Sequence, residues 1–222
     1  MELNTYPLVC TRGVVLYPNQ EIVIDVGRDT SVHAVENAQD NYDKKICLFS
    51  QKELEQENPG KEDIYSVGTL CEVRHIRRFD NFLRVKFRGI KRVKLNNWIN
   101  GSLSDLAEVE ILESEKQDAV EEEALIRMIA DELDRMQGQD RFVTKEIVME
   151  ISKGMGGEFL SDKAVQGLPL DIERKQQYLE TLGVNDRLMM LLQDMAKEKK
   201  MSEVEQQINE TVKERIDQGQ KD

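Results

Sequence analysis

The sequence predicts an α+β protein, with a small β-barrel or β-sandwich domain that contains one helix, followed by a helical bundle ending in a long extended helix. Three observations predict this fold class. Short segments of alternating apolar and polar residues fill the first half of the chain. The period of the apolar residues becomes helical near residue 115. From Asn185 onward, neither proline nor glycine occurs until Gly219.

Five segments of the first half have the pattern of β-strands. Most alternate, but one has the continuous apolar run that is typical of a strand buried on both faces. Asn100-Gly101 predicts a two-residue hairpin turn, because both residues tolerate positive φ. The strand segments are Glu21–Val26, Lys45–Phe49 (the continuous run), Val67–Val73, Leu83–Arg88 and Ala107–Ile111.

One helix interrupts these strands. Asp29 and Thr30 are residues that favour a helix N-cap, and the helix is expected to end by Asp40-Asn41. The polar segment Glu53–Asp63 contains a Pro-Gly pair and predicts an exposed loop. The residues expected near one face of the helix are Val32, Val35 and Gln39.

Helical periodicity begins after a linker expected at Glu113–Asp118. Two parallel stripes step by four residues, and Gly138 is expected to end that helix. A short helix is expected around Phe159–Val165, and Asp171 is expected to cap a helix through Leu182. The stripes are Val120, Ala124 and Met128; Leu125, Ile129 and Leu133; and, in the next helix, Val143, Ile147 and Ile151.

The last helix, from Asn185, has a narrow apolar stripe in a mostly charged segment, which is typical of a coiled-coil seam. We therefore expect that the chain is a fragment of a longer protein or that this helix meets a partner. The stripe consists of Met201, Val204, Ile208, Val212 and Ile216.

Composition excludes several function classes. The net charge of −12 argues against general nucleic-acid binding, which needs cations that displace phosphate counterions. No apolar run is long enough to span a membrane, and no signal peptide is present, so we expect a cytoplasmic protein. The three cysteines form no CxxC pair, and the two histidines, His33 and His75, exclude a histidine-rich metal site.

The motifs of common enzyme sites are absent. The sequence has no GxxxxGK[ST] phosphate loop, and it has no GxGxxG, HExxH or GxSxG motif. We therefore expect no catalytic residue, no metal and no bound cofactor in this chain, and hydrolysis of neither ATP nor peptides.

A basic cluster between Arg74 and Lys94 has two interpretations. It could bind RNA or an acidic polypeptide, or it could be the solvent face of a hairpin, where Lys and Arg discourage edge-to-edge pairing. The second interpretation is favoured because aromatic residues are not interleaved on the basic face.

Several segments in series resemble the N-terminal region of bacterial Lon, an ATP-dependent AAA+ serine protease. They are similar to that family's PLLPLRxxVxFP opening, its VGREKS turn, its VGT strand start, VEGLQRARI and the later LPLxxxxKQxLLExxDVxERL block. Cys10-Thr11 and Gly183 depart from the family pattern. In that order, the segments are Pro7–Pro18, Asp25–Ser31, Tyr65–Thr69, Phe87–Val93 and Leu168–Leu188.

The resemblance implies a PUA-like β-domain over residues 1–113, a helical subdomain over 118–184 and a long helix over 185–222 that leads toward an ATPase ring. It implies a substrate-recognition and assembly module, with protein substrates and other Lon subunits of a hexamer as partners, while ATP and Mg are expected only in the ATPase domain of the parent protein. Residues 1–113 and 118–222 are expected to be separable units.

The resemblance also implies substrate contacts near the start of the first helix, and an apolar edge before that helix would extend them. Two other functions stay open: a stand-alone Lon-domain protein that binds peptides, and a PUA-type RNA-binding protein. The expected substrate-binding residues are Tyr17, Pro18, Arg28, Asp29, Thr30 and His33.

Overall fold

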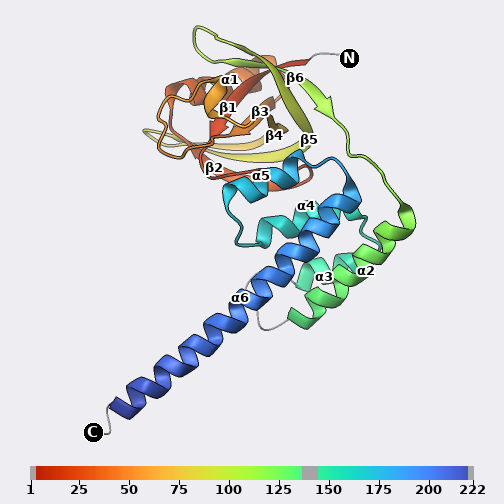
Figure 1. Ribbon diagram of the computed structural model, residues 1–222. Coiled ribbons are helices and arrows are strands. Elements are labelled where there is room, and N and C mark those ends of the chain that lie inside the picture. The colour runs from red at the N-terminus through yellow and green to blue at the C-terminus, as the bar shows by residue number, and fades with distance from the viewer. Residues whose placement is uncertain (1–3, 137–144, 220–222) are drawn as a thin grey trace.

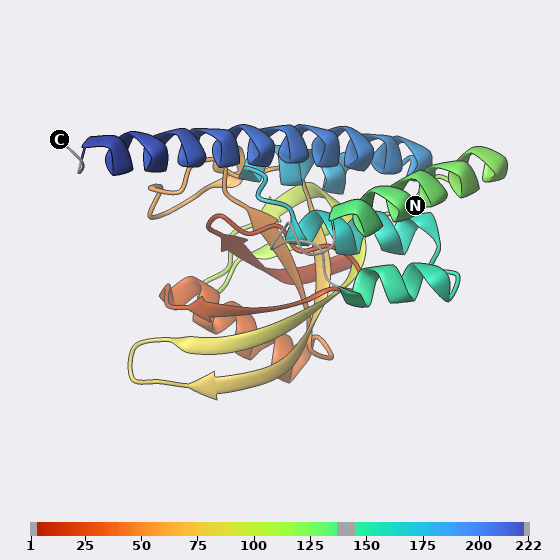
Figure 2. The ribbon, with the colours of Figure 1, turned by 90° about the horizontal axis from the view of Figure 1, so that it is seen from below.

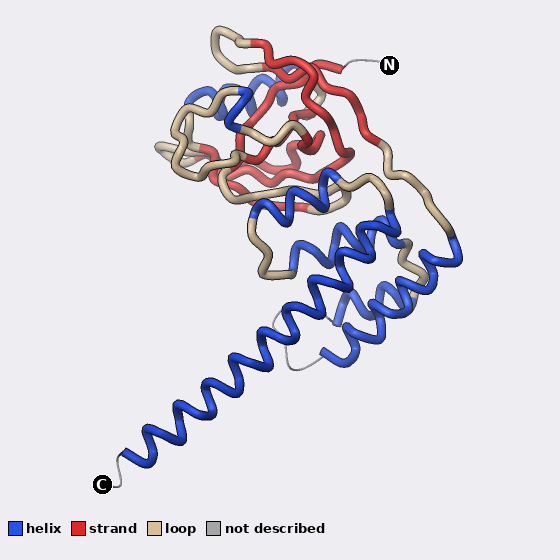
Figure 3. Tube along the Cα trace, viewed as in Figure 1, coloured by secondary structure: helices blue, strands red, loops and turns tan. Residues whose placement is uncertain are grey.

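A computed structural model describes residues 4–136 and 145–219. Strands gather in one part of the molecule and helices α2 to α6 in the other, and the last helix projects away from both (Figures 1 and 3). The α+β fold class predicted from the sequence is confirmed. The strands are β1 (Asn4–Thr11), β2 (Glu21–Val26), β3 (Lys45–Ser50), β4 (Val67–Arg78), β5 (Leu83–Ile99) and β6 (Leu106–Leu112).

The strands form a barrel that is closed at one end. Their order is β2-β5-β4-β3-β1-β6, and β6 also pairs with β5. Strand β5 is 17 residues long, so that its first half pairs with β2 and its second half with β6. β1 and β3 are parallel, whereas the other pairs are antiparallel. The connection between the parallel strands runs through β2 and a helix, because parallel neighbours need a crossover.

That helix, α1 (Asp29–Asn41), packs its small residues onto the barrel. Arg28 occupies the N-cap position and its side chain caps nothing, so Asp29 and Thr30 lie inside the first turn. Val35 is buried as expected, but Gln39 is exposed, and the buried face lies closer to the N-terminus than predicted. It consists of Ser31, Ala34, Val35 and Ala38.

The expected two-residue turn at Asn100-Gly101 is wrong. β5 ends at Ile99 and β6 begins at Leu106, so that residues 100–105 form a wider loop. Gly101 does not adopt positive φ, and its N–H instead donates to Asp105 Oδ1 at 3.2 Å. The carboxylate of Asp105 closes a loop that the local Asn-Gly signal cannot anticipate.

The helices of the second half are α2 to α6. The stripe of Leu125, Ile129 and Leu133 is buried, whereas Val120 and Met128 of the other stripe are exposed. Gly138, the predicted end of the first of these helices, and Val143, the first residue of the next predicted stripe, lie outside the described residues. The bounds are α2 (Ala119–Met136), α3 (Lys145–Ser152), α4 (Gly157–Gly167), α5 (Ile172–Glu180) and α6 (Val184–Gly219).

Asp171 caps α5 as predicted, by accepting a hydrogen bond from the Arg174 backbone N–H at 2.7 Å. The following helix, α6, is 36 residues long, about 54 Å at the usual rise per residue. One face of its first part is buried as far as Met195, whereas Met189 is 42% exposed. The apolar stripe beyond that point, which the sequence pattern likens to a coiled-coil seam, is exposed, with Ile208 56% exposed.

A continuous core joins the barrel to the helices. Val15, Tyr17 and Val67 of the barrel pack in the same cluster as the apolar residues of α2, α4 and α6. Tyr17 donates its hydroxyl to Lys175 O at 2.7 Å, and Gln176 Nε2 donates to Val67 O at 2.8 Å.

A buried ionic group also crosses this joint. Arg92 of β5 donates two hydrogen bonds to the carboxylate of Asp162 on α4, at 2.5 and 2.9 Å, and Arg187 of α6 lies 3.8 Å from the same carboxylate. All three side chains are at most 2% exposed. The joint is therefore fixed by charge as well as by apolar packing.

Candidate functional site

The candidate site is a hollow of about 330 Å³ between β1, β2 and the start of α1. Its apolar wall comes from both strands, and two arginines lie at its rim. The lining residues are Val9, Cys10, Thr11, Arg12, Ile24, Asp25, Val26, Gly27, Arg28 and Ser31.

The pairing of the strands explains why this hollow exists. β1 pairs with β6 only over Asn4–Pro7, after which the Leu8 N–H donates to Asp105 O at 3.2 Å. β2 is the last strand in the sheet order and pairs with β5 alone. The second half of β1 therefore faces β2 across an opening in the barrel wall.

Arg28 stands where this opening meets α1. Its guanidinium donates to Cys10 O at 3.3 Å and to the side-chain oxygen of Gln51, which is fully buried. Gln51 Nε2 in turn donates to Gln56 O at 2.9 Å, so the loop after β3 is tied to the same group. Partial burial and, secondarily, the charge of Arg12 lower the pKa of the Arg28 guanidinium.

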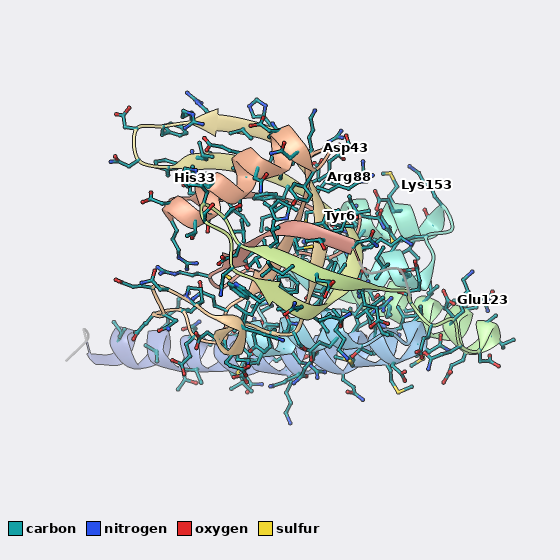
Figure 4. The ribbon with its side chains drawn as sticks, turned by 90° about the horizontal axis from the view of Figure 1, so that it is seen from above. Tyr6, His33, Asp43, Arg88, Glu123 and Lys153 are labelled. Atoms are coloured by element: carbon teal, nitrogen blue, oxygen red, sulfur yellow. The ribbon has the colours of Figure 1, made fainter. Side chains whose placement is uncertain are left out.

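Two further hollows adjoin α1. One of about 150 Å³ shares Cys10 and Arg28 with the first hollow and is also lined by Thr30 and Trp98. The other, of about 400 Å³, is lined by His33 and the loop that carries Leu103, which is 66% exposed. Figure 4 shows His33 projecting from α1. The first helix is thus bordered by open surface along much of its length.

The structure brings together only some of the predicted site residues. Arg28 and Thr30 share a hollow, whereas Asp29 lines none of the three hollows around α1. His33 lines a different hollow and lies 3.3 Å from a carboxylate oxygen of Glu36. Whether these residues bind a substrate is still a prediction.

The expected exposed apolar edge at Tyr17-Pro18 is wrong, because both residues are buried. Tyr17 is 0% exposed, and burial raises the pKa of its phenol well above the usual range. Its ring fills the joint with the helices instead of a surface. The sequence pattern could not distinguish these positions, since an apolar edge and an apolar joint have the same composition.

Sequence reasoning also missed residues of the hollow. Val9 lies in β1 and Arg12 follows it directly, and the periodicity of the sequence predicts no strand there. β1 pairs with β3 at long range and in parallel, which leaves no hairpin signal in the sequence. The available clue was the apolar run Leu8–Cys10 followed by a cation at Arg12.

The basic cluster of β4 and β5 is largely neutralised within the structure. Arg92 is buried against Asp162, and five other members pair with nearby carboxylates. The tip of this hairpin lies on the side of the barrel away from α6 (Figure 2). The pairs are Arg74–Glu72, Arg78–Glu36, Arg84–Asp25, Lys86–Glu21 and Lys91–Glu113.

The remaining chemistry of the described residues is limited. Residues 4–136 and 145–219 contain no group of three or more His, Cys, Asp or Glu side chains placed to hold a metal ion. Burial raises the pKa of the Cys10 thiol to about 12, and that of Cys47 is raised for the same reason. No helix within the described part of the chain is long and apolar enough to cross a membrane.

Residues 5–197 match the family described as "ATP-dependent protease La (LON) substrate-binding domain". The Lon protease of Brevibacillus choshinensis is 31% identical over 217 residues, and that of Syntrophomonas wolfei is 33% identical over 225 residues. These alignments cover 97% and 100% of this chain but only 28% of each relative. The chain thus spans less than a third of the length of the curated relatives that it matches.

Two solved structures are similar in fold. The N-terminal domain of the Mycobacterium avium complex Lon protease aligns with a TM-score of 0.70 and 19% identity, over 87% of this chain and 98% of that one. A Lon N-terminal domain protein from Xanthomonas campestris aligns with a TM-score of 0.60 and 16% identity, over 85% and 97%.

Proposed function

This chain belongs to the family of LON substrate-binding domains, and on that premise we propose that it binds unfolded or degron-bearing proteins for an ATP-dependent Lon protease. In this proposal its partners are protein substrates and other Lon subunits. ATP hydrolysis and peptide-bond cleavage would belong to other parts of such a protease.

The observation that carries the proposal is the open surface around α1. Three hollows border this helix, and the exposed apolar side chain of Leu103 stands beside one of them. Unfolding adds exposed apolar side chains to a protein, so a module that selects unfolded chains needs accessible apolar surface of its own. The affinity of one module would be weak, roughly 10–1000 μM, and several copies in an assembly would add avidity.

A titration with an unfolded protein tests this proposal. Reduced and carboxymethylated lactalbumin should bind the chain in this range, and the native form of the same protein should bind at least tenfold more weakly. Equal binding of the two forms, or no binding of the unfolded form, would contradict the proposal.

Two matched variants locate the surface. Leu103→Ser removes an apolar side chain beside α1, and Val120→Ser removes one on α2 that is 78% exposed. We expect Leu103→Ser to weaken binding of the unfolded protein several-fold and Val120→Ser to leave it unchanged. The reverse result would place the binding surface on the helices.

RNA binding is the weaker candidate. Six of the nine cations between Arg74 and Lys94 are paired with carboxylates, so few remain to displace the counterions of a phosphate backbone. Binding of RNA at low salt that weakens steeply as salt is added would favour this alternative.

A further inference from the structure

Two arginines at the rim of the hollow between β1 and β2 have no carboxylate partner. Among the residues that the structure describes, no Asp or Glu oxygen lies within 4.0 Å of the guanidinium of Arg12 or Arg28. Both donate only to neutral oxygens: Arg12 to Gln56 O at 3.3 Å, and Arg28 to Cys10 O and the Gln51 side chain.

The acids around these arginines form no ion pair with them. Asp25 lines the same hollow, but its two carboxylate oxygens accept hydrogen bonds from Arg84 at 2.7 and 2.8 Å. Glu57 and Asp105 line the adjacent hollow of about 150 Å³ together with Arg28, and Asp105 Oδ1 accepts a hydrogen bond from the Gly101 N–H at 3.2 Å.

The first turn of α1 borders the same hollow through Ser31, and Arg28 at its N-cap caps no backbone N–H, while the exposed Asp29 is the one acid of that turn. A cationic rim in a protein of net charge −12 is complementary to an anionic ligand.

The wall beside these cations is apolar. Val9 and Val26 are each 4% exposed, and Ile24 is half-buried. A ligand that fills this hollow therefore presents an anion and an apolar group within one space of about 330 Å³. The C-terminal residue of a polypeptide carries both groups on the same residue, whereas an internal Asp or Glu carries the anion alone.

We propose that this hollow binds the C-terminal residue of an extended polypeptide. Its carboxylate accepts hydrogen bonds from Arg28 and Arg12, and its apolar side chain lies against Val9, Ile24 and Val26. Capture of a terminal carboxylate by clustered donors is a recurring mode of peptide recognition. This inference rests on the proposed function and names the part of a substrate that the hollow selects.

The test compares two fluorescein-labelled decapeptides that end in leucine and differ only in the terminal group. One has a free carboxylate and the other a C-terminal amide. In anisotropy titrations with the whole chain, the amide peptide should bind about tenfold more weakly than the carboxylate peptide, which is a difference of about 1.4 kcal/mol in binding free energy. A third peptide, amidated and with glutamate before the final leucine, should bind like the plain amide.

Variants assign the difference to the hollow. In Arg28→Gln the carboxylate and amide peptides should bind alike, and in Arg12→Gln the difference should be reduced. Arg12 is exposed, so its replacement keeps the test decisive if Arg28→Gln fails to fold. The matched control is Arg77→Gln on β4, an exposed arginine outside the hollow, which should keep the full difference.

The outcomes separate this inference from the proposed function. Equal binding of the carboxylate and amide peptides, together with binding of unfolded lactalbumin, would overturn the inference and leave the function in place. Rescue of the amide by the internal glutamate, or a difference that survives in Arg12→Gln and Arg28→Gln, would also overturn it. If neither the peptides nor unfolded lactalbumin bind, both the inference and the proposed function are contradicted.

Discussion

A single carboxylate, Asp162, lies between two arginines at the joint of barrel and helices. Burial raises its pKa even though Arg92 and Arg187 oppose the shift, and burial also lowers the pKa of Arg187 to about 10. Charges removed from water stabilise a fold only while their partners stay in place. The two arginines therefore depend on this one acid.

Replacement of Asp162 by alanine should strongly destabilise the protein. It leaves two buried guanidinium groups without a counter-charge, which costs about 3–5 kcal/mol of unfolding free energy. Urea unfolding followed by circular dichroism measures this loss as a lower midpoint. The control is Glu123→Ala on α2, whose partner Arg127 is 75% exposed, and it should leave the midpoint nearly unchanged. Similar shifts in the two variants would refute the role given to the buried group.

Among the elements, α2 and α6 are linked by a carboxylate that titrates. Glu132 of α2 accepts a hydrogen bond from Lys199 of α6 at 3.0 Å, and this bond, with the nearby charge of Arg135, lowers the pKa of Glu132 below its usual 4.5. A carboxylate with a lowered pKa in the folded state stabilises it above pH 4.5, and this contribution is lost as the pH falls through the lowered value.

Glu132→Gln should therefore reduce the acid sensitivity of the fold. The urea midpoint of the unaltered chain should fall further between pH 7 and pH 3.5 than that of the variant, because the glutamine has no charge to lose. Glu123→Gln serves as the control at an exposed position of the same helix and should behave like the unaltered chain. An identical pH dependence in Glu132→Gln would mean that the contact with Lys199 adds no stability.

Most elements could be predicted from local patterns, and those that could not depend on distant partners. β2, α1 and the cap of α5 follow from alternation, helix boundaries and a capping aspartate. β1 could not be predicted from periodicity, because its parallel pairing with β3 leaves no local signal in the sequence. Among the residues that line the hollow, Arg28 is predicted by the family resemblance. Val9 and Arg12 can be assigned to the hollow only once the position of β1 in the sheet is known. The sequence pattern predicts a surface position for Tyr17, but its burial depends on α5, more than 150 residues later in the chain.

For the molecule as a whole, the chain between the two halves is held at several points. Glu115 N–H donates to Leu182 O at 2.8 Å, and Val184 N–H donates to Glu115 O at 3.1 Å. Gln117 accepts a hydrogen bond from the Asn185 N–H at 2.9 Å. The division at residues 113–118 is still a proposal, and these contacts suggest that the two sides stay associated when the chain between them is cut.

Cleavage of a protease site inserted after Glu113 should leave the halves together. The continuous core and the Arg92–Asp162 pair cross the joint, so the two fragments should elute as one species in gel filtration and separate only in denaturant. The same site inserted after Asn58, in the exposed loop before β4, controls for the effect of the insertion. Separate elution after cleavage at Glu113 would show that each half folds and persists alone.

Because α6 is one straight, continuous helix, its length sets the orientation of the barrel relative to the far end of the helix. Beyond Met195 the helix continues for roughly 36 Å to Gly219, with no proline or internal glycine to absorb a change in length. One residue inserted there would turn everything before it by about 100° and shift it by about 1.5 Å relative to whatever holds the far part of the helix. Seven residues would nearly restore the angle. Insertions and deletions in this part of α6 should therefore be tolerated best in steps of about seven or eleven residues, because such steps nearly restore the orientation of the hollow about the helix axis.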